Sequence, residues 1–483
     1  MQTQTTERSA PAPHSGSVAA NQPLNDAAAP QLTDELAAPT VSRGYQCQCG
    51  RPVFLRNSQC LACQTPLGYV ADRLGVVPLA PAGEEGAFTV FGDEGGKRYR
   101  RCENFLGPSG CNWLVPIVNE GEEAPPETHG LRPGLCLACS ATRTIPDLSV
   151  PENAELWNKL EQAKRRLISQ LLALGLPVVS RLADPQHGLA FDFLSNLPGA
   201  PHVMTGHDSG VITLNAEEAD DSVRERIRAQ MREPYRTLLG HFRHEIGHYY
   251  WDLLVAPTGW LEPCRQLFGD ERADYGQALR NHYDNGPPPD WASRFVTSYA
   301  SAHPWEDWAE TWAHYLHMAD TADTALSFGV NASNVELSSD LFKADDLWQP
   351  DHPDAAQFLD FLNGWVRLTN VLNEFSRSMG QPDNYPFVLP HAVVGKLQFI
   401  HQVIADQRNG VSTAPTAFAA PVEPAMSPDS SIPMESAAPA DETAPAPVNE
   451  PVAPVPELPQ ADAPLAPVDA PQPVAASGNR EGG

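Results

Sequence analysis

The chain has 483 residues and a hydrophobic content of 42%, enough for two or three domains with ordinary packed cores. Its formal net charge of -28 argues against nucleic acid or an anionic membrane surface as the main partner, because both bind a cationic face. The first residues lack a basic start followed by an apolar segment, and no run of about 18 apolar residues occurs, so we expect no signal peptide, no membrane span and a cytoplasmic location.

Both ends of the chain are predicted to be disordered. Residues 1–43 are rich in Ala, Pro, Ser, Thr and Gln and poor in aromatic residues. Residues 412–483 form a Pro- and Ala-rich acidic stretch in which Arg480 is the one basic residue. Proline and low hydrophobicity prevent a packed fold there. No recognition motif stands out, so we interpret both as solvated tails rather than docking arms.

Eight of the nine cysteines fall into two groups of four within residues 44–145. The first cysteine cluster has the spacing C-x-C-x10-C-x2-C and consists of Cys47, Cys49, Cys60 and Cys63. The second cysteine cluster is C-x8-C followed by C-x2-C and consists of Cys102, Cys111, Cys136 and Cys139. Thiolates are good tetrahedral zinc ligands, and in a reducing compartment such spacing indicates metal sites rather than disulfides. We therefore predict a zinc-ribbon region that holds two structural zinc ions.

The pattern changes in the next region, residues 146–411. Apolar residues recur at helical spacing over 153–174, and Gly175 and Pro177 end that predicted helix. Residues 202–215 predict a hairpin with its turn near Gly206 to Gly210. Most later segments predict helices. The expected fold class is α+β, with ribbon modules followed by a mainly helical domain that contains a small sheet.

Residues 235–255, YRTLLGHFRHEIGHYYWDLLV, predict an amphipathic helix whose polar face carries the chemistry. One apolar stripe consists of Leu239, Phe242, Ile246, Tyr249 and Leu253. His244 and His248 are four residues apart on the opposite face, so both imidazoles can reach one cleft. In this H-E-x-x-H arrangement the two imidazoles can bind one zinc ion and Glu245 can act as the general base. The alternative is an incidental pair of surface histidines.

A catalytic zinc needs a third protein ligand and an open position for water. Trp251 and Leu254 stand where the pattern H-E-x-x-H-x-x-G-x-x-H would require Gly and His, so we look for a carboxylate instead. Residues 303–317, HPWEDWAETWAHYLH, predict a helix with Glu306 and Glu310 on one face. We assign Glu306 as the ligand and Glu310 as the acid that accepts an imidazole N–H. The swapped assignment and an ordinary solvated acidic face remain open.

Further candidates precede that second helix. Asp270, together with Glu271 and Asp274, could support a ligand or replace it, although surface ion pairs with neighbouring arginines are the simpler role. Tyr299 or His303 could donate a hydrogen bond to the oxyanion of a tetrahedral intermediate. Packing is the alternative for both.

The combination of segments is more specific than any single motif. The relevant segments are RPVFLRNSQCLACQTPLGY, CNWLVP, LCLACSATRTIPDL, WNKLEQAKRRL, GVITLNAEEAD, GHFRHEIGHYYWD, FGDERADYGQAL and HPWEDWAETWAHYLH. Over about residues 44–400 the chain resembles the bacterial family of zinc-binding metallopeptidases with an N-terminal zinc ribbon. The resemblance implies a zincin-like, gluzincin-type domain in which His244 and His248 bind zinc, Glu245 is the base and Glu306 is the third ligand. One departure is the C-x-C pair, where ribbons usually have C-x2-C.

The sequence therefore predicts a zinc-dependent peptidase with one catalytic and two structural zinc ions. Zinc would lower the pKa of its bound water towards about 7, and Glu245 would take the proton. A peptide or protein is the expected substrate, and the ribbons or tails could dock a protein partner. The alternatives are a zinc-stabilised interaction protein with a vestigial peptidase domain, and amide hydrolysis in a non-protein substrate such as a cell-wall peptide.

Overall fold

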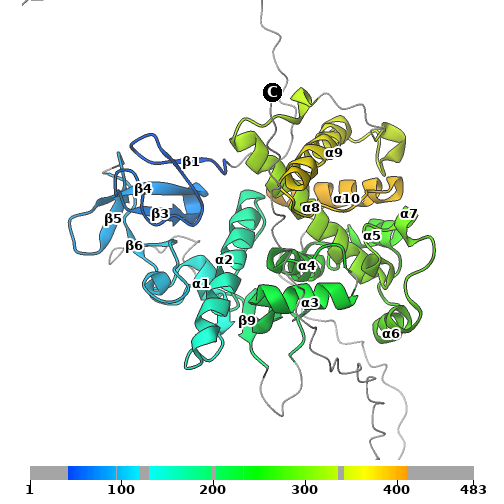
Figure 1. The fold of residues 1–483 in the computed structure, drawn as a ribbon, viewed down its shortest axis with the longest axis horizontal. Helices are drawn as coiled ribbons and strands as arrows, with labels where there is room; N and C mark the ends of the chain where they lie inside the picture. Colours follow the sequence, from blue (N-terminus) through cyan, green and yellow to red (C-terminus); the bar gives the residue numbers. More distant parts are fainter. Residues whose placement is uncertain are drawn as a thin grey trace, which may run out of the picture. The chain divides into compact units, whose positions relative to one another are not determined.

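The computed structural model describes residues 42–93, 95–118, 130–196, 203–231, 233–335 and 342–410, all of which belong to one compact unit (Figure 1). The strands are β1 (Tyr45–Gln46), β2 (Pro52–Val53), β3 (Leu67–Val70), β4 (Gly75–Pro81), β5 (Ala87–Val90), β6 (Tyr99–Arg101), β7 (Leu114–Pro116), β8 (Thr142–Thr144), β9 (Ala190–Leu194), β10 (Gly206–Asp208) and β11 (Val211–Asn215). The α-helices are α1 (Leu137–Ser140), α2 (Pro151–Ala173), α3 (Asp221–Met231), α4 (Leu238–Tyr250), α5 (Leu261–Phe268), α6 (Tyr275–Asn285), α7 (Trp291–Arg294), α8 (Pro304–Ser327), α9 (Ala355–Ser378) and α10 (His391–Arg408). Apart from Ser42 and Arg43, the predicted tails lie outside the described residues.

The cysteine-rich region folds as small antiparallel sheets. Strands β1 and β2 pair with each other, and β3 to β7 form a five-stranded sheet in chain order. The buried rings of Tyr69 and Trp113 stack with their centroids 4.2 Å apart. The α+β class with ribbon modules at the N-terminal end is confirmed.

A second, four-stranded sheet has the order β10-β11-β9-β8. Strands β8, β9 and β11 are parallel, and β10 is an antiparallel edge strand. The predicted hairpin is confirmed: β10 and β11 are joined at Ser209 and Gly210, both with positive φ, as a tight two-residue hairpin turn requires. Strand β8 follows directly after the second cysteine cluster, so that cluster is continuous with the body's sheet.

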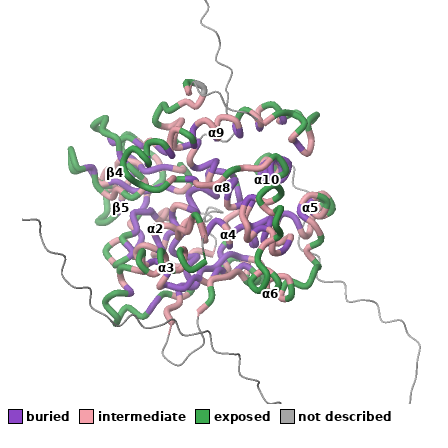
Figure 2. The backbone as a smooth tube through the Cα atoms, turned by 45° about the vertical axis from the view of Figure 1, so that its right-hand side comes forward, coloured by how far each residue is buried: buried purple, intermediate pink, exposed green. Residues whose placement is uncertain are grey.

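Helices α2, α4 and α8 pack together beside this sheet, and each contains many buried side chains (Figure 2). The apolar face of α4 meets the sheet, where the ring of Phe242 lies 5.7 Å from Phe191 and 6.1 Å from Phe193. On its other side α4 approaches α8 at Gly247, where an added Cβ would lie 3.1 Å from the Cα of Ala309. A larger residue there would push the helices apart. This close approach fixes the polar residues of α4 against those of α8.

The predicted helix boundaries are close to those observed. Helix α2 begins with Pro151 in its first turn, and Gly175 with φ +72° follows its end. Helix α4 begins at Leu238, because the Thr237 hydroxyl accepts the backbone N–H of Gly240 at 3.0 Å. Beyond α4 the chain continues as a π-helical turn over Trp251–Val255, a local widening that often accompanies functional sites.

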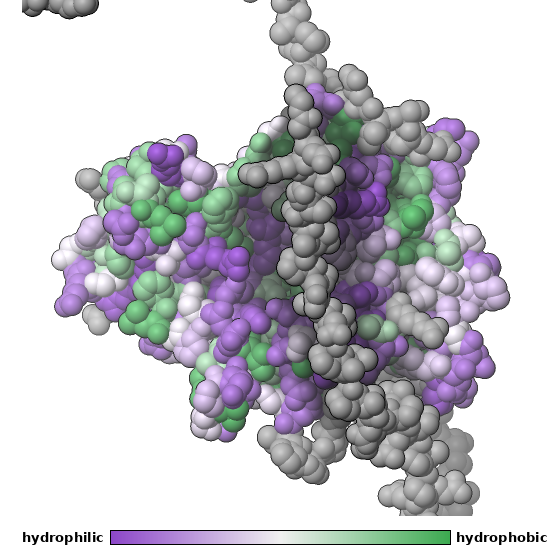
Figure 3. Space-filling view, viewed as in Figure 1, coloured by the Kyte–Doolittle hydropathy of each residue, from purple (hydrophilic) through white to green (hydrophobic). Residues whose placement is uncertain are grey.

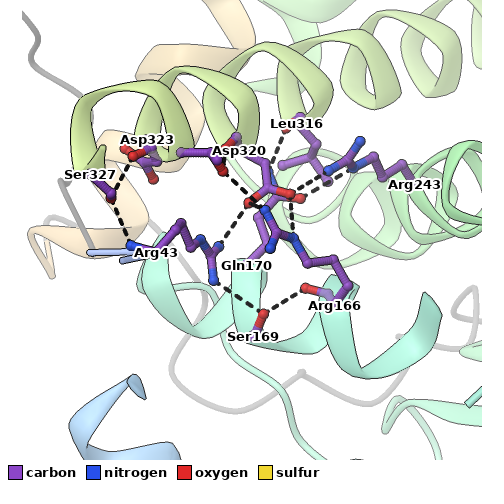
Figure 4. Close-up of polar contacts among 10 residues, drawn as sticks. Arg43, Arg166, Ser169, Gln170, Arg243, Leu316, Asp320, Asp323 and Ser327 are labelled. Carbon is purple, nitrogen blue, oxygen red and sulfur yellow. Dashed lines mark hydrogen bonds and ion pairs between the residues drawn. The ribbon is translucent and has the colours of Figure 1, made fainter. Parts of the chain in front are cut away.

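A buried polar network joins the start of the cysteine-rich region to the helical body (Figure 4). The Asp320 carboxylate on α8 lies 3.1 Å from Arg43 Nη2, 2.7 Å from Arg166 Nε and 2.9 Å from Arg243 Nη2. The backbone N–H of Arg43 also donates to the Ser327 hydroxyl at 2.7 Å. We call these five residues the Asp320 network. Through this network the segment that leads into β1 is bonded to α8, whose Asp320 carboxylate also pairs with Arg166 of α2 and Arg243 of α4.

The molecular surface on the side shown in Figure 3 is mostly polar, with small apolar patches over the cysteine-rich region and beside α10. Within the described residues, no helix is both long and apolar enough to cross a membrane.

Candidate metal centre

The two histidines of α4 and one glutamate of α8 converge on one point. His244 Nε2 lies 3.2 Å from His248 Nε2 and 3.0 Å from Glu306 Oε2, and His248 Nε2 lies 3.7 Å from the same oxygen. We call these residues the His–His–Glu cluster. Glu306 is 1% exposed, and its Oε2 has no hydrogen-bond donor among the described residues.

These distances fit a tetrahedral zinc ion. With bonds of about 2.0–2.1 Å, two ligand atoms on such an ion lie about 3.3 Å apart. The three observed separations bracket that value. Two ring nitrogens and a carboxylate oxygen cannot all satisfy one another by hydrogen bonds at such distances, because they bring lone pairs to the same place. The donor set is also one that zinc favours.

Glu310, one turn after Glu306 on α8, orients the first imidazole. Its Oε1 lies 2.6 Å from His244 Nδ1, and its Oε2 accepts the Thr297 hydroxyl at 2.7 Å. For the metal-bound state we assign the single proton of His244 to Nδ1, because Nε2 must then offer its lone pair to the metal. Burial disfavours the charged imidazole, but the carboxylates of Glu306 and Glu310 outweigh it and raise the pKa of His244 well above its usual value. The cluster therefore favours positive charge at this point.

Glu245 follows His244 on the same helix and is 8% exposed. Burial raises the pKa of its carboxyl group, and the neighbouring imidazoles of His244 and His248 partly oppose that rise. A carboxylate whose pKa is shifted towards neutrality is a more effective proton acceptor than a solvated one.

Two tyrosines stand beside the cluster. The ring of Tyr299, in a short 3-10 turn before α8, lies 6.0 Å from that of His244. Burial and the nearby Glu306 carboxylate raise the pKa of Tyr299, so its hydroxyl keeps its proton. Tyr275, the first residue of α6, donates a hydrogen bond to Glu306 Oε1 at 2.6 Å.

The structure gives two of the predicted site residues other roles. His303 is the N-cap of α8: its Nδ1 accepts the backbone N–H of Trp305 at 3.1 Å, and its Nε2 lies 3.1 Å from the carbonyl of Ala273. Both ring nitrogens are thus occupied, and neither is left to donate to an oxyanion. Asp270 pairs with Arg272 at 2.7 Å at the surface and is not brought to the His–His–Glu cluster.

The edge strand β10 and an aromatic side chain border His248. The ring of His207 on β10 stacks 6.3 Å from that of His248, and Trp305 lies 4.1 Å from His248 on the α8 side. Burial lowers the pKa of His207 to about 4, so this imidazole is neutral at physiological pH. An extended chain could pair with an edge strand in this position by backbone hydrogen bonds.

The sequence analysis missed Tyr275, Thr297 and His207. Thr297 and His207 lie outside the predicted metal-binding motifs. Tyr275 directly follows a group of acidic residues that were expected to form surface ion pairs. One signal was present in the sequence. The hairpin was predicted before the helix that carries the H-E-x-x-H motif, and the first strand of that hairpin contains His207, which could have been considered as a neighbour of the metal site.

The two cysteine clusters share a ligand set but differ in burial. All eight cysteines are free thiols, and each cluster brings four sulfurs within 4.8 Å of one another. The Sγ atoms of Cys47 and Cys63 lie 3.5 Å apart, those of Cys49 and Cys60 lie 3.7 Å apart, and those of Cys111 and Cys136 lie 3.6 Å apart. Sulfurs on a tetrahedral zinc with bonds of about 2.3 Å would lie about 3.8 Å apart, close to these values.

Comparison with known proteins gives matches over most of the described chain. Residues 153–403 match the family described as "Putative zinc-binding metallo-peptidase", and residues 44–150 match a zinc-ribbon domain. Uncharacterized proteins of Mycobacterium bovis and of two Mycobacterium tuberculosis strains are each 41% identical over 366 residues, 75% of this chain and 95% of the relative. No solved structure matches the chain.

Proposed function

The chain belongs to the zinc-binding metallopeptidase family, and from this premise we propose that it is a zinc-dependent peptidase whose general base is Glu245. The observation that carries the proposal is the convergence of His244 Nε2, His248 Nε2 and Glu306 Oε2 at separations that match tetrahedral zinc. A zinc ion held by these three residues would supply Lewis acidity and would lower the pKa of a bound water towards about 7.

The residues of the chain supply the remaining functions. Glu245 takes the proton from the attacking water and passes it to the leaving amine. Glu310 holds the His244 ring in the orientation that presents Nε2, since it engages Nδ1 at 2.6 Å. Tyr299 keeps its proton beside the cluster and donates a hydrogen bond to the oxyanion. Strand β10 aligns an extended peptide substrate along the cluster.

We further propose that each cysteine cluster holds one structural zinc ion, which gives three ions per chain. Four thiolates close the coordination sphere of zinc and leave no position for water, so these two ions take no part in hydrolysis.

Metal analysis and peptidase assays of three proteins test the proposal. The wild type should contain three zinc ions and cleave members of a proteome-derived peptide library. Glu245→Gln should retain three ions and lose activity by a factor of at least about 100, which is the range of one acid–base group. His248→Ala should contain two ions and be inactive. A Glu245→Gln protein with wild-type turnover would refute the assigned base.

Two tightly bound ions in the wild type, unchanged in His244→Ala, would favour the zinc-stabilised interaction protein instead. Cleavage of cell-wall peptides in preference to the peptide library would redirect the substrate assignment without changing the chemistry.

A further inference from the structure

Helix α6 lies against the His–His–Glu cluster but contributes little to the packed core. None of its residues is buried, and Figure 2 shows it exposed or half-exposed along its length. A glycine with positive φ stands on each side, Gly269 at +104° before it and Gly286 at +75° directly after it. Segments with few buried contacts and exposed backbone open at low free-energy cost. Specific contacts must therefore hold α6 in place.

The strongest of these contacts is made with a proposed metal ligand. The Tyr275 hydroxyl donates to Glu306 Oε1 at 2.6 Å, which is short for a hydroxyl–oxygen hydrogen bond and typical of a carboxylate acceptor. A second contact, from His303 Nε2 to the Ala273 carbonyl at 3.1 Å, holds the residues before the helix. The ring of His282 also lies 5.9 Å from that of Tyr299.

The Tyr275 contact divides the two oxygens of Glu306 between different partners. Oε1 accepts the phenol, while Oε2 points at the two imidazoles and has no hydrogen-bond donor among the described residues. A free carboxylate can bind a metal through one oxygen or through both. With Oε1 engaged, one-oxygen binding through Oε2 is favoured, and the fourth corner of a tetrahedral ion stays open.

We propose that Tyr275 is a positioning residue that holds Glu306 to one-oxygen metal binding, and that it thereby couples the closure of α6 to metal occupancy. This inference rests on the proposed metal site. A metal on Oε2 fixes the Glu306 side chain, a fixed Glu306 offers Oε1 to the phenol, and the phenol fixes the start of α6. When the metal is lost, the Glu306 side chain is no longer fixed, its hydrogen bond with Tyr275 weakens, and the start of α6 is released.

The test compares Tyr275→Phe with wild type and with Tyr283→Phe as a matched control. Tyr283 is on the same helix, and its side chain is 58% exposed. Metal retained per chain is measured against a graded chelator, and His248→Ala gives the content of the cysteine sites alone. A residue that hydrogen-bonds to a metal ligand typically contributes about 10- to 100-fold to metal affinity. Tyr275→Phe should therefore bind the third ion at least about 10-fold more weakly than the wild type. Tyr283→Phe should match the wild type.

Hydrogen exchange provides a second readout, independent of activity. Amides of residues 275–285 should exchange more slowly in the metal-loaded wild type than after chelation of the third ion. In Tyr275→Phe that difference should vanish, while exchange in α8 stays unchanged.

The outcomes are distinguishable. Equal metal affinity in Tyr275→Phe and wild type, with the metal-dependent protection of α6 intact, would overturn the role of Tyr275 and leave the metal site standing. A His248→Ala protein with the metal content of the wild type would remove the metal site and the inference together.

Discussion

Each of the two cysteine clusters offers four thiol ligands, but the two clusters are joined to the body of the molecule in different ways. In the first cluster Cys47 and Cys60 are buried while Cys49 and Cys63 are exposed; in the second all four are buried. The first lies on short strands whose entry is fixed by side chains of the Asp320 network. The second is followed within three residues by β8, a strand of the body's own sheet.

The second cluster also borders two buried cations of α2. Lys164 is 0% exposed and lies 2.7 Å from Glu161, while Arg165 donates to the Ser109 carbonyl at 2.8 Å. Burial lowers the pKa of Arg165, but the thiol of Cys111 and other nearby acids raise it above its ordinary value. Four thiolates around one zinc carry a net charge of about -2, and buried charge is tolerated when it is paired. The negative charge of the second site is therefore balanced by buried cations of the helical body, whereas the first site lies in a peripheral module.

The largest expected effect of this difference is on folding. Cys139→Ser removes one ligand of the second site, and structural zinc contributes apparent binding free energies of about 10–16 kcal/mol, comparable to the whole stability of a domain. Because β8 starts three residues later, we expect the helical body to lose its cooperative thermal transition, as monitored by far-UV circular dichroism.

The matched variant in the first site is Cys63→Ser. It should lose one zinc ion and leave the transition of the body within a few degrees of the wild type, because no strand of the four-stranded sheet depends on it. If both variants unfold the body to the same extent, the proposed contrast between the sites is wrong.

A second prediction concerns the buried cations. Lys164→Met leaves Glu161, which is 1% exposed, without its closest cation, and breaking a buried pair from one side costs about 3–5 kcal/mol. Urea unfolding should show that loss, and the double variant Lys164→Met with Glu161→Gln should recover part of it. A loss below about 1 kcal/mol in the single variant would show that Lys164 is not needed for the charge balance.

Local periodicity explains which of these features could be predicted. The cysteine spacing and the helical phase of His244 and His248 are local, so they could be read from the chain, and Glu306 followed from the same reasoning on a second helix. The contact of Tyr275 with Glu306 spans 31 residues and depends on how an exposed helix lies against α8. Similarly, the pairing of β8 with β9 spans a long connection through α2, and three residues give too short a pattern to predict.

The third prediction weakens the connection of the first site. Arg43→Met removes the ion pair with Asp320, but Arg166 and Arg243 still satisfy that carboxylate, so we expect a loss of only about 1–2 kcal/mol. The effect should be local: amides of residues 45–53 should exchange faster, while those of β8 and β9 should not. Faster exchange in β8 would mean that the Asp320 network also supports the second site.

The last prediction is a dependence on pH at the same junction. Asp323 is 4% exposed, its Oδ1 has no hydrogen-bond partner among the described residues, and burial raises its pKa to about 7, with Arg43 opposing and Asp320 reinforcing the rise. Below about pH 4 the carboxyl is protonated in both the folded and the unfolded chain, so it contributes no dependence on pH. Between about pH 4 and pH 7 the unfolded chain releases this proton and the folded chain keeps it, so stability falls as pH rises, and above pH 7 the penalty stays constant. A rise of about three pKa units corresponds to about 4 kcal/mol, so Asp323→Asn should stabilise the protein by roughly that amount at pH 8 and by almost nothing at pH 4, as measured by urea unfolding. An equal gain at both values would show that the pKa of Asp323 is the same in the folded and the unfolded chain, and would contradict the proposed effect of burial.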